Sequence, residues 1–130
     1  SIIAFHDTLP LDRRSSTKKR STGFWTGDVW KIIPFLMTER PDLQIATIKA
    51  PPSGLTLVGG LSPSHPATLA ETMARAVAYD TLDYREFDES WRARMLLVEN
   101  SRPALAEVES IQRMAERFKE ERDGRFARGH

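Results

Sequence analysis

The fold is decided by residues 43–58, LQIATIKAPPSGLTLV. Apolar and polar residues alternate imperfectly over 43–50, and residues 55–58 form a second stretch rich in β-forming residues. The intervening PPSG, at 51–54, is a strong turn signal. Two strands joined by so short a connection predict an antiparallel hairpin.

A short apolar run lies upstream of the hairpin, at residues 2–5, and ends in the polar residues His6, Asp7 and Thr8. This run predicts a buried strand whose carboxyl end meets solvent. Ligands of open α/β sheets bind outside the carboxyl ends of strands, so His6 and Asp7 are candidates for chemistry. An imidazole accepts a proton near neutral pH, and a carboxylate can ligate a hard cation. The alternative is a turn in which Asp7 bonds local amides.

Residues 9–24 are rich in Pro, Ser and Thr and cannot bury a core face. They predict a surface loop, either a solvated lid or a site for a phosphate or an acidic substrate. Its five basic residues are Arg13, Arg14, Lys18, Lys19 and Arg20.

Residues 25–37 have apolar residues at nearly helical spacing and predict a helix. Pro34 lies inside this pattern, so the helix should kink there or a second helical turn should begin there. Trp25, Asp28 and Trp30 are candidate substrate-binding residues, because two indole rings could clamp a ligand ring. The alternative is helix capping by Asp28 and core packing by the aromatic residues.

The second half of the chain predicts mainly helices. Leu69, Met73 and Val77 mark one apolar face of a helix over residues 67–80. Residues 83–89 are acidic and typical of a turn, and residues 91–98 fit a short helix or a short strand, with helix favoured.

An amphipathic helix is expected over residues 103–122, where apolar residues recur at spacings of three or four. Its stripe consists of Leu105, Val108, Ile111, Ala115 and Phe118.

The composition excludes several classes of protein. The 130 residues are the size of one domain, and 40% hydrophobic with 28% charged residues is typical of a globular protein. Lys and Arg total 19 against 18 Asp and Glu, a balance that argues against nucleic-acid binding over a broad face. No apolar run is long enough to span a membrane. The absence of cysteine excludes disulfide and thiolate sites and fits a cytoplasmic location.

Four segments together resemble the C-terminal half of class I S-adenosylmethionine-dependent methyltransferases, in the branch that is similar to small-molecule and sugar O-methyltransferases. The resemblance covers about residues 1–60. Its segments are IIAFHDTLP at 2–10, WTGDVWK at 25–31, RPDL at 40–43 and PSGLTLV at 52–58.

The resemblance implies an α/β fold: the C-terminal part of a Rossmann-like, seven-stranded sheet whose last strand is antiparallel and inserted beside the fifth. Residues 2–5 would be strand five, residues 44–50 strand six and residues 55–58 strand seven. Residues 1–60 would then belong to the methyltransferase-like domain, and residues 61–130 would be a helical extension packing on it.

The resemblance also implies methyl transfer from S-adenosylmethionine to a hydroxyl of a small molecule or sugar. His6 and Asp7 correspond to an Asp-Asn pair that binds a divalent cation in metal-dependent relatives, which makes Asp7 a candidate metal ligand. Histidine in the first position weakens the case for Mg²⁺, which prefers oxygen ligands, and favours His6 as a general base.

The half of that family's domain that binds the cofactor would precede residue 1. We therefore expect this chain to be the C-terminal portion of a methyltransferase, active only with the missing N-terminal half or a partner chain. The rival hypothesis is a non-enzymatic binding module, in which the terminal helix and the hairpin edge form an assembly or homo-oligomer interface. RNA binding through residues 13–20 ranks last.

Overall fold

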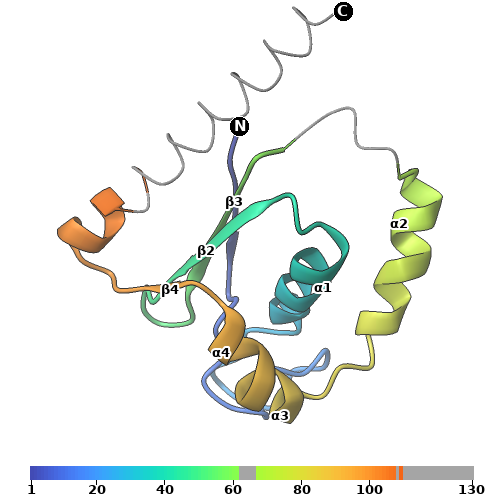
Figure 1. Cartoon of the computed structure of the whole chain (residues 1–130). Coiled ribbons are helices and arrows are strands. Elements are labelled where there is room, and N and C mark those ends of the chain that lie inside the picture. Colours follow the sequence, from blue (N-terminus) through green and yellow to red (C-terminus); the bar gives the residue numbers. More distant parts are fainter. Residues whose placement is uncertain (62–66, 108, 110–130) are drawn as a thin grey trace, which may run out of the picture.

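The computed structural model describes residues 1–61, 67–107 and 109 (Figure 1). The fold is α/β and is built around a four-stranded mixed sheet with the order β1-β3-β2-β4. The strands are β1 (Ile3–His6), β2 (Gln44–Ile48), β3 (Leu55–Gly59) and β4 (Leu97–Val98).

Strands β2 and β3 form the antiparallel hairpin that the sequence predicts, with Thr47 opposite Thr56. The turn closes with a hydrogen bond from the Gly54 amide to the Ala50 carbonyl at 2.8 Å. Strand β1 pairs antiparallel with the other edge of β3, and β4 pairs parallel with β2. Strands β1 and β2 are therefore parallel to each other, with β3 between them in the opposite direction.

Strand β1 forms where the apolar run predicts it, but the expected burial of this strand is wrong. Ile2 and Ile3 are exposed, as are Ala4 and His6, and only Phe5 is half-buried. The reason is that β1 lies at the end of the strand order, so only one of its edges is paired. Its other edge presents backbone amides and carbonyls that no described strand covers.

One face of the sheet is covered by η1 (Val29–Lys31), a 3-10 turn that leads into the helix α1 (Ile32–Glu39). Pro34 lies in the first turn of α1, where a missing backbone donor costs no helical hydrogen bond. The new helical turn expected near this proline is thus confirmed. The buried core on this face consists of Leu9, Trp30, Ile33, Phe87 and Met95.

Phe87 comes from a short helical run, which the sequence did not predict. The run comprises α3 (Tyr84–Glu86), the π-helical turn η3 (Phe87–Trp91) and α4 (Arg92–Arg94). The prediction of an acidic turn over 83–89 is therefore wrong. Phe87 of this helical run is fully buried against Trp30. The helix favoured over 91–98 ends at Arg94, and the next residues reach β2 as strand β4.

The helix predicted over 67–80 is present as α2 (Leu69–Ala76) followed by the 3-10 turn η2 (Val77–Tyr79). A capping box begins it: the Glu71 amide donates to Thr68 Oγ1, and the Thr68 amide donates to the Glu71 carboxylate. Its apolar stripe nevertheless faces solvent, with Leu69, Met73 and Val77 76%, 62% and 71% exposed. In Figure 1, α2 stands apart at one side of the sheet.

The opposite face of the sheet buries Ala46, Ile48 and Val98, and Ala104 and Leu105 pack against them. Residues 102–107 are helical, in agreement with the start of the helix expected over 103–122. The remainder of that expected helix, apart from residue 109, lies outside the described residues.

Residues 61–130 do not form a purely helical addition, because they contribute strand β4 to the sheet. No helix in the described ranges combines the length and apolarity that a membrane span requires.

Candidate functional site

The polar pair predicted after the first strand lies at the carboxyl end of β1. His6 is the last strand residue and pairs with Leu55 of β3. Asp7 follows with a φ of 62°, in the left-handed region that few residues other than glycine adopt. This backbone conformation turns the chain at the strand end and brings the Asp7 carboxylate against both His6 and the hairpin turn.

The Asp7 carboxylate joins His6 to Ser53 of the hairpin turn. His6 Nδ1 lies 2.9 Å from one Asp7 oxygen, and the Ser53 hydroxyl donates to the other oxygen. The His6 side chain is 84% exposed. A carboxylate on Nδ1 orients the imidazole and leaves its Nε2 as the atom that can accept a proton from a ligand. Ser53 therefore joins the His6–Asp7 pair predicted from the sequence.

A row of buried threonine hydroxyls fixes this strand end to the hairpin. The Thr56 hydroxyl donates to Thr8 Oγ1 at 2.8 Å and lies 2.7 Å from Thr47 Oγ1. All three side chains are essentially inaccessible. The Leu9 amide adds a 2.6 Å bond to the Ser53 carbonyl. Buried hydroxyls that satisfy one another hold their strands in a fixed register, so the His6–Asp7 pair stands on a rigid base.

A divalent cation at Asp7 would need further oxygen ligands, because Ca²⁺ and Mg²⁺ take six or more. Both Asp7 oxygens already contact His6 or Ser53. Among residues 1–61, 67–107 and 109, no three histidine, aspartate or glutamate side chains converge on one point. The described part of this chain therefore does not fit a cation site by itself.

A groove of about 580 Å³ lies where β1 and β2 end, beside the same hairpin turn. Segment 9–11 forms one wall, the turn residues another, and Tyr84, Asp88 and Arg92 of the helical run a third. This groove could not be predicted from the sequence, since its walls come from three distant segments. The only signal available was the spacing of Tyr84, Asp88 and Arg92, which places them on one side of a helix.

The three candidate substrate-binding residues do not come together. Trp30 is buried in the core, where its ring packs on Phe87 and its Nε1 donates to the Ser16 carbonyl at 2.9 Å. Trp25 is about 39% exposed and donates to the Thr17 carbonyl. The structure thus favours the core-packing alternative for Trp30, and neither tryptophan lines the groove.

Asp28 lines a separate pocket of about 300 Å³ between η1 and α2, which Phe35 and Tyr79 also line. Its carboxylate lies 3.5 Å from Lys31 Nζ, and Lys31 Nζ also donates to the Asp80 carbonyl. No side-chain capping bond from Asp28 is present. Asp28 therefore helps to hold η1 to the segment after α2, away from the groove.

The basic loop is tied to the fold at several points. The Thr26 amide donates to the Ser15 carbonyl at 2.9 Å and closes the loop at its base. Arg13 and Lys18 each lie 3.5 Å from an aspartate of the segment 80–83. Two of the five basic side chains are therefore ion-paired within the chain, which reduces the positive charge available to an acidic partner.

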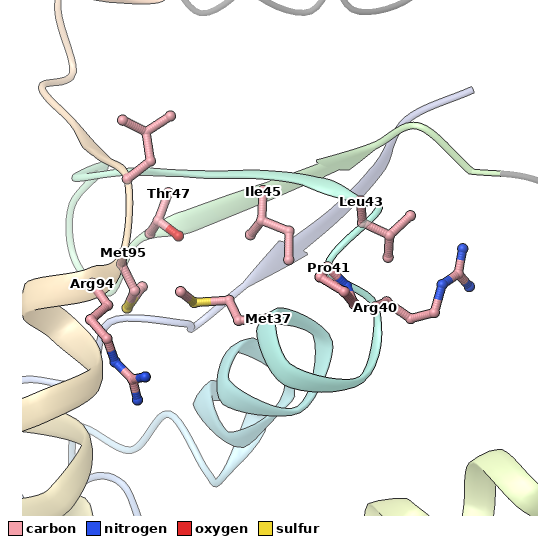
Figure 2. A pocket seen from close by; sticks show the side chains of 9 residues that line it. Met37, Arg40, Pro41, Leu43, Ile45, Thr47, Arg94 and Met95 are labelled. Atoms are coloured by element: carbon pink, nitrogen blue, oxygen red, sulfur yellow. The ribbon is translucent and has the colours of Figure 1, made fainter. Parts of the chain in front are cut away.

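Figure 2 shows another pocket, of about 270 Å³, which lies along β2 on the side of α1. Met37, Ile45 and Met95 point into it, whereas the guanidinium groups of Arg40 and Arg94 point away. Arg40 is held by Asp42 at 2.8 and 2.9 Å, and Arg94 stacks 3.8 Å above the Trp91 ring. An apolar pocket without convergent polar groups offers no catalytic machinery.

The chain was also compared with known proteins. No protein-family model matches it, and neither the curated proteins nor the solved structures yielded a match.

Proposed function

We propose that this chain supplies the acceptor-side half of an α/β methyltransferase of the S-adenosylmethionine-dependent type, acting on a hydroxyl of a small molecule or sugar. The observation that carries the proposal is the strand order β1-β3-β2, in which β3 runs antiparallel between two parallel strands. That order agrees with the fifth, seventh and sixth strands expected from the sequence resemblance. The outer edge of β1, which no described strand pairs, is where the sheet would continue.

His6 and Asp7, at the carboxyl end of β1, would be the catalytic residues. His6 Nε2 would accept the proton of the acceptor hydroxyl as the oxygen attacks, and Asp7 would hold the imidazole through Nδ1. Ser53 would fix the Asp7 carboxylate through its hydrogen bond. A base positioned in this way contributes about 10²–10⁴-fold to a proton-transfer step.

S-adenosylmethionine would supply the methyl group that the acceptor oxygen attacks, with the S–CH₃ bond breaking to leave the neutral thioether S-adenosylhomocysteine. In the groove at the hairpin turn, the lining carboxylate is Asp88, and Arg92 already lies 2.9 Å from it. This groove therefore does not fit the cofactor, whose ribose hydroxyls need a free carboxylate in Rossmann-like sites. We assign cofactor binding to a missing N-terminal half or a partner chain that completes the sheet at β1.

The natural polypeptide that contains these residues provides the test. Its intact mass should exceed the 14.8 kDa of this chain by about 10 kDa or more, the size of half a domain. It should transfer a radiolabelled methyl group from S-adenosylmethionine, and the rate should fall by about 10²-fold or more in His6→Ala. His6→Gln should be equally slow, because the amide conserves polarity but cannot accept the proton.

A polypeptide of 14.8 kDa with no affinity for S-adenosylmethionine, alone or with its partners, would contradict the proposal. Full activity in His6→Ala would leave the methyltransferase assignment standing and remove His6 from it. Circular dichroism spectra of the variants check that the fold is retained.

The second candidate function is a non-enzymatic assembly module, which the exposed stripe of α2 favours. The hairpin edge expected to form this interface is unsuitable, because β2 is covered by β4 and β3 by β1. An assembly would use β1 or α2 instead. Self-association in light scattering, without affinity for S-adenosylmethionine, would distinguish this function from methyl transfer.

A further inference from the structure

We propose that helix α2 and the basic loop together form a surface that binds the interface of an anionic lipid bilayer. This inference goes beyond the proposed function and does not depend on it. Three features carry it: the exposed apolar row of α2, the cations beside the end of that row, and an exposed tryptophan next to those cations.

The apolar row of α2 consists of Leu69, Met73 and Val77, which lie on one face because they are spaced at four residues. Each of the three side chains is more than half exposed. The neighbouring positions 70, 74 and 78 are exposed alanines, so this face of the helix presents apolar groups without a charge between them.

The charged residues of α2 lie on the other side of the helix. Glu71 belongs to the capping box with Thr68, and Arg75 Nη1 lies 3.6 Å from a carboxylate oxygen of Glu39 in α1. Helix α2 stands apart from the sheet (Figure 1), so the fold contacts it on the polar side. A helix with one apolar face and one polar face is suited to lie in the plane of a bilayer interface.

The basic loop meets the C-terminal end of the apolar row. Helix α2 continues into η2, where the Asp80 amide donates to the Val77 carbonyl at 3.2 Å. Side chains three residues apart eclipse in a 3-10 turn, so Asp80 extends the row by one position. Lys18 Nζ lies 3.5 Å from the Asp80 carboxylate. Cations of the loop are therefore held directly beside the apolar row.

The cations of the loop outnumber the carboxylates of the loop and of segment 80–83 by five to three. Arg13 and Lys18 pair with aspartates of that segment at 3.5 Å, and all four side chains are more than half exposed. Exposed pairs of this kind contribute little, so lipid phosphates can replace them. Among the described residues, no carboxylate pairs with Lys19 or Arg20, whose charges are available to anionic headgroups.

Trp25 adds an aromatic group to the same surface. Its Nε1 donates at 2.6 Å to the carbonyl of Thr17, the residue before Lys18. The side chains of Trp25 and Phe24 are each 39% exposed. Tryptophan is enriched where membranes meet water, because its ring is apolar and its N–H is polar. The loop thus combines cations and aromatic groups next to an aliphatic helix face.

A bilayer fits this surface better than other partners do. Bases of single-stranded RNA stack on aromatic side chains, and the aliphatic row of α2 offers no ring. A partner helix needs a groove between elements, whereas α2 presents a ridge (Figure 1). A second copy of this chain would cover the row but leave Lys19 and Arg20 without a partner.

The test is co-sedimentation of the natural polypeptide that contains these residues with lipid vesicles, in the absence of S-adenosylmethionine. Its partition coefficient should be about 10-fold or more higher on vesicles of phosphatidylcholine and phosphatidylglycerol in equal parts than on phosphatidylcholine alone. Added salt should weaken the binding, because it screens exposed charges. No binding to the mixed vesicles, or equal binding to both kinds, would overturn the inference.

The apolar row is tested by Met73→Gln, which should lower partition into the mixed vesicles by about 10-fold because it removes a buried apolar side chain from the bound state. The matched control is Leu96→Gln, at a leucine that is 51% exposed just before β4, and it should change partition by less than about 2-fold. Circular dichroism checks that both variants remain folded. Equal losses in the two variants would contradict the assignment of the row.

The cations are tested by Lys19→Gln and Arg20→Gln, each of which should lower partition into the mixed vesicles by about 3–5-fold. Arg85→Gln is the matched control, because this exposed cation lies on α3 and pairs with Glu89. A loss in Arg85→Gln as large as in the loop variants would mean that net charge, and not this surface, determines binding.

Two further measurements distinguish the other occupants. Light scattering without lipid that shows self-association, abolished by Met73→Gln, would make the row an interface between copies and overturn the inference. A uridine oligonucleotide that binds through Lys19 and displaces the vesicles, with no effect of Met73→Gln on either ligand, would overturn it in favour of RNA.

Failure of this inference is distinguishable from failure of the proposed function, because vesicle binding is measured without S-adenosylmethionine and methyl transfer without lipid. Methyl transfer without vesicle binding would retain the enzyme and refute the lipid surface. Vesicle binding that depends on Met73 and Lys19, without methyl transfer, would retain the lipid surface and refute the enzyme.

Discussion

Helices α1 and α2 are equally long, eight residues each, but the chain uses them in opposite ways. Helix α2 follows the local rules better, since it has a capping box, whereas no side chain caps α1. Nevertheless α1 buries Ile33 and Pro34, and α2 buries no residue. Local signals thus determine that a helix forms, whereas the sheet determines which helix has a covered face.

The same contrast holds between strands. Strand β3 lies between two neighbours and buries Thr56 and Val58, whereas β1 has one neighbour among the described strands and leaves Ile3 and Ala4 exposed. The core beneath α1 is therefore buried by residues of the described part of this chain alone. The apolar surfaces of β1 and α2 are the parts that a further half-domain or a partner would cover.

The largest expected loss of stability distinguishes the covered helix α1 from the exposed helix α2. Ile33→Ala should lower the free energy of unfolding by about 2–5 kcal/mol, because it opens a cavity in the core beside Trp30. Leu69→Ala on α2 should change it by no more than about 0.5 kcal/mol, because that side chain is mainly in solvent.

Urea denaturation followed by tryptophan fluorescence measures both variants against the original chain. Similar losses in the two variants would mean that the α2 stripe is covered in solution, either by other residues of this chain or by a second copy. Dependence of the Leu69→Ala result on protein concentration would identify the second copy.

The next effect concerns the hairpin turn that supports the candidate site. Gly54 has a φ of 82°, and an added β-carbon would lie 2.8–3.0 Å from Leu9. Gly54→Ala should therefore cost about 2–4 kcal/mol, combining backbone strain with overpacking. Gly23→Ala is the matched control, because nothing lies within 4 Å of its added β-carbon. An unaffected melting temperature in Gly54→Ala would show that the turn relaxes freely.

The hairpin could be predicted from the sequence because its signals are local. Alternation over 43–50 and the turn at 51–54 fix both strands and their connection without reference to the rest of the chain. The helical run containing Phe87 was not predicted from the sequence. Its acidic residues made the segment resemble a turn, so the helical spacing of the apolar residues Tyr84, Phe87 and Trp91 was not recognised. Its π-helical turn also departs from the usual period of 3.6 residues.

The candidate site was predictable in part for the same reason. His6 and Asp7 follow an apolar run directly, so a strand end and two polar groups were visible in one segment. Ser53 joins them from 46 residues away, through pairing that only the folded sheet creates. Trp30 carried an aromatic signal that fits both a ligand clamp and a core residue, and only its burial favours the core.

A smaller loss of stability is expected when the row of buried threonine hydroxyls beneath the His6–Asp7 pair is interrupted. Thr56→Val conserves shape but leaves Thr8 and Thr47 without their shared partner, which should cost about 1–3 kcal/mol. Thr17→Val, at an exposed loop position, should cost less than about 0.5 kcal/mol. Hydrogen exchange of the β1 and β3 amides should accelerate in the first variant only. Unchanged exchange there would mean that the row does not hold the strand end.

The smallest effect is a pH dependence confined to α2. Hydrogen bonds from the Thr68 amide, and then from its side chain, hold the pKa of Glu71 below its usual value. A carboxyl whose folded pKa is lowered stabilises the helix above its unfolded pKa and loses that contribution as pH falls through the folded value. Amide shifts of α2 should therefore report fraying as the pH falls below the ordinary glutamate pKa of about 4.5.

Glu71→Gln removes the titrating group and should abolish this transition, while the amides of α1, which has no acidic residue in its first turn, serve as the internal reference. Because α2 buries no residue, its fraying should leave the core melting temperature almost unchanged. A core that melts together with α2 would show that the two regions are coupled in solution. Helices α1 and α2 would then differ in exposure, but they would not unfold independently.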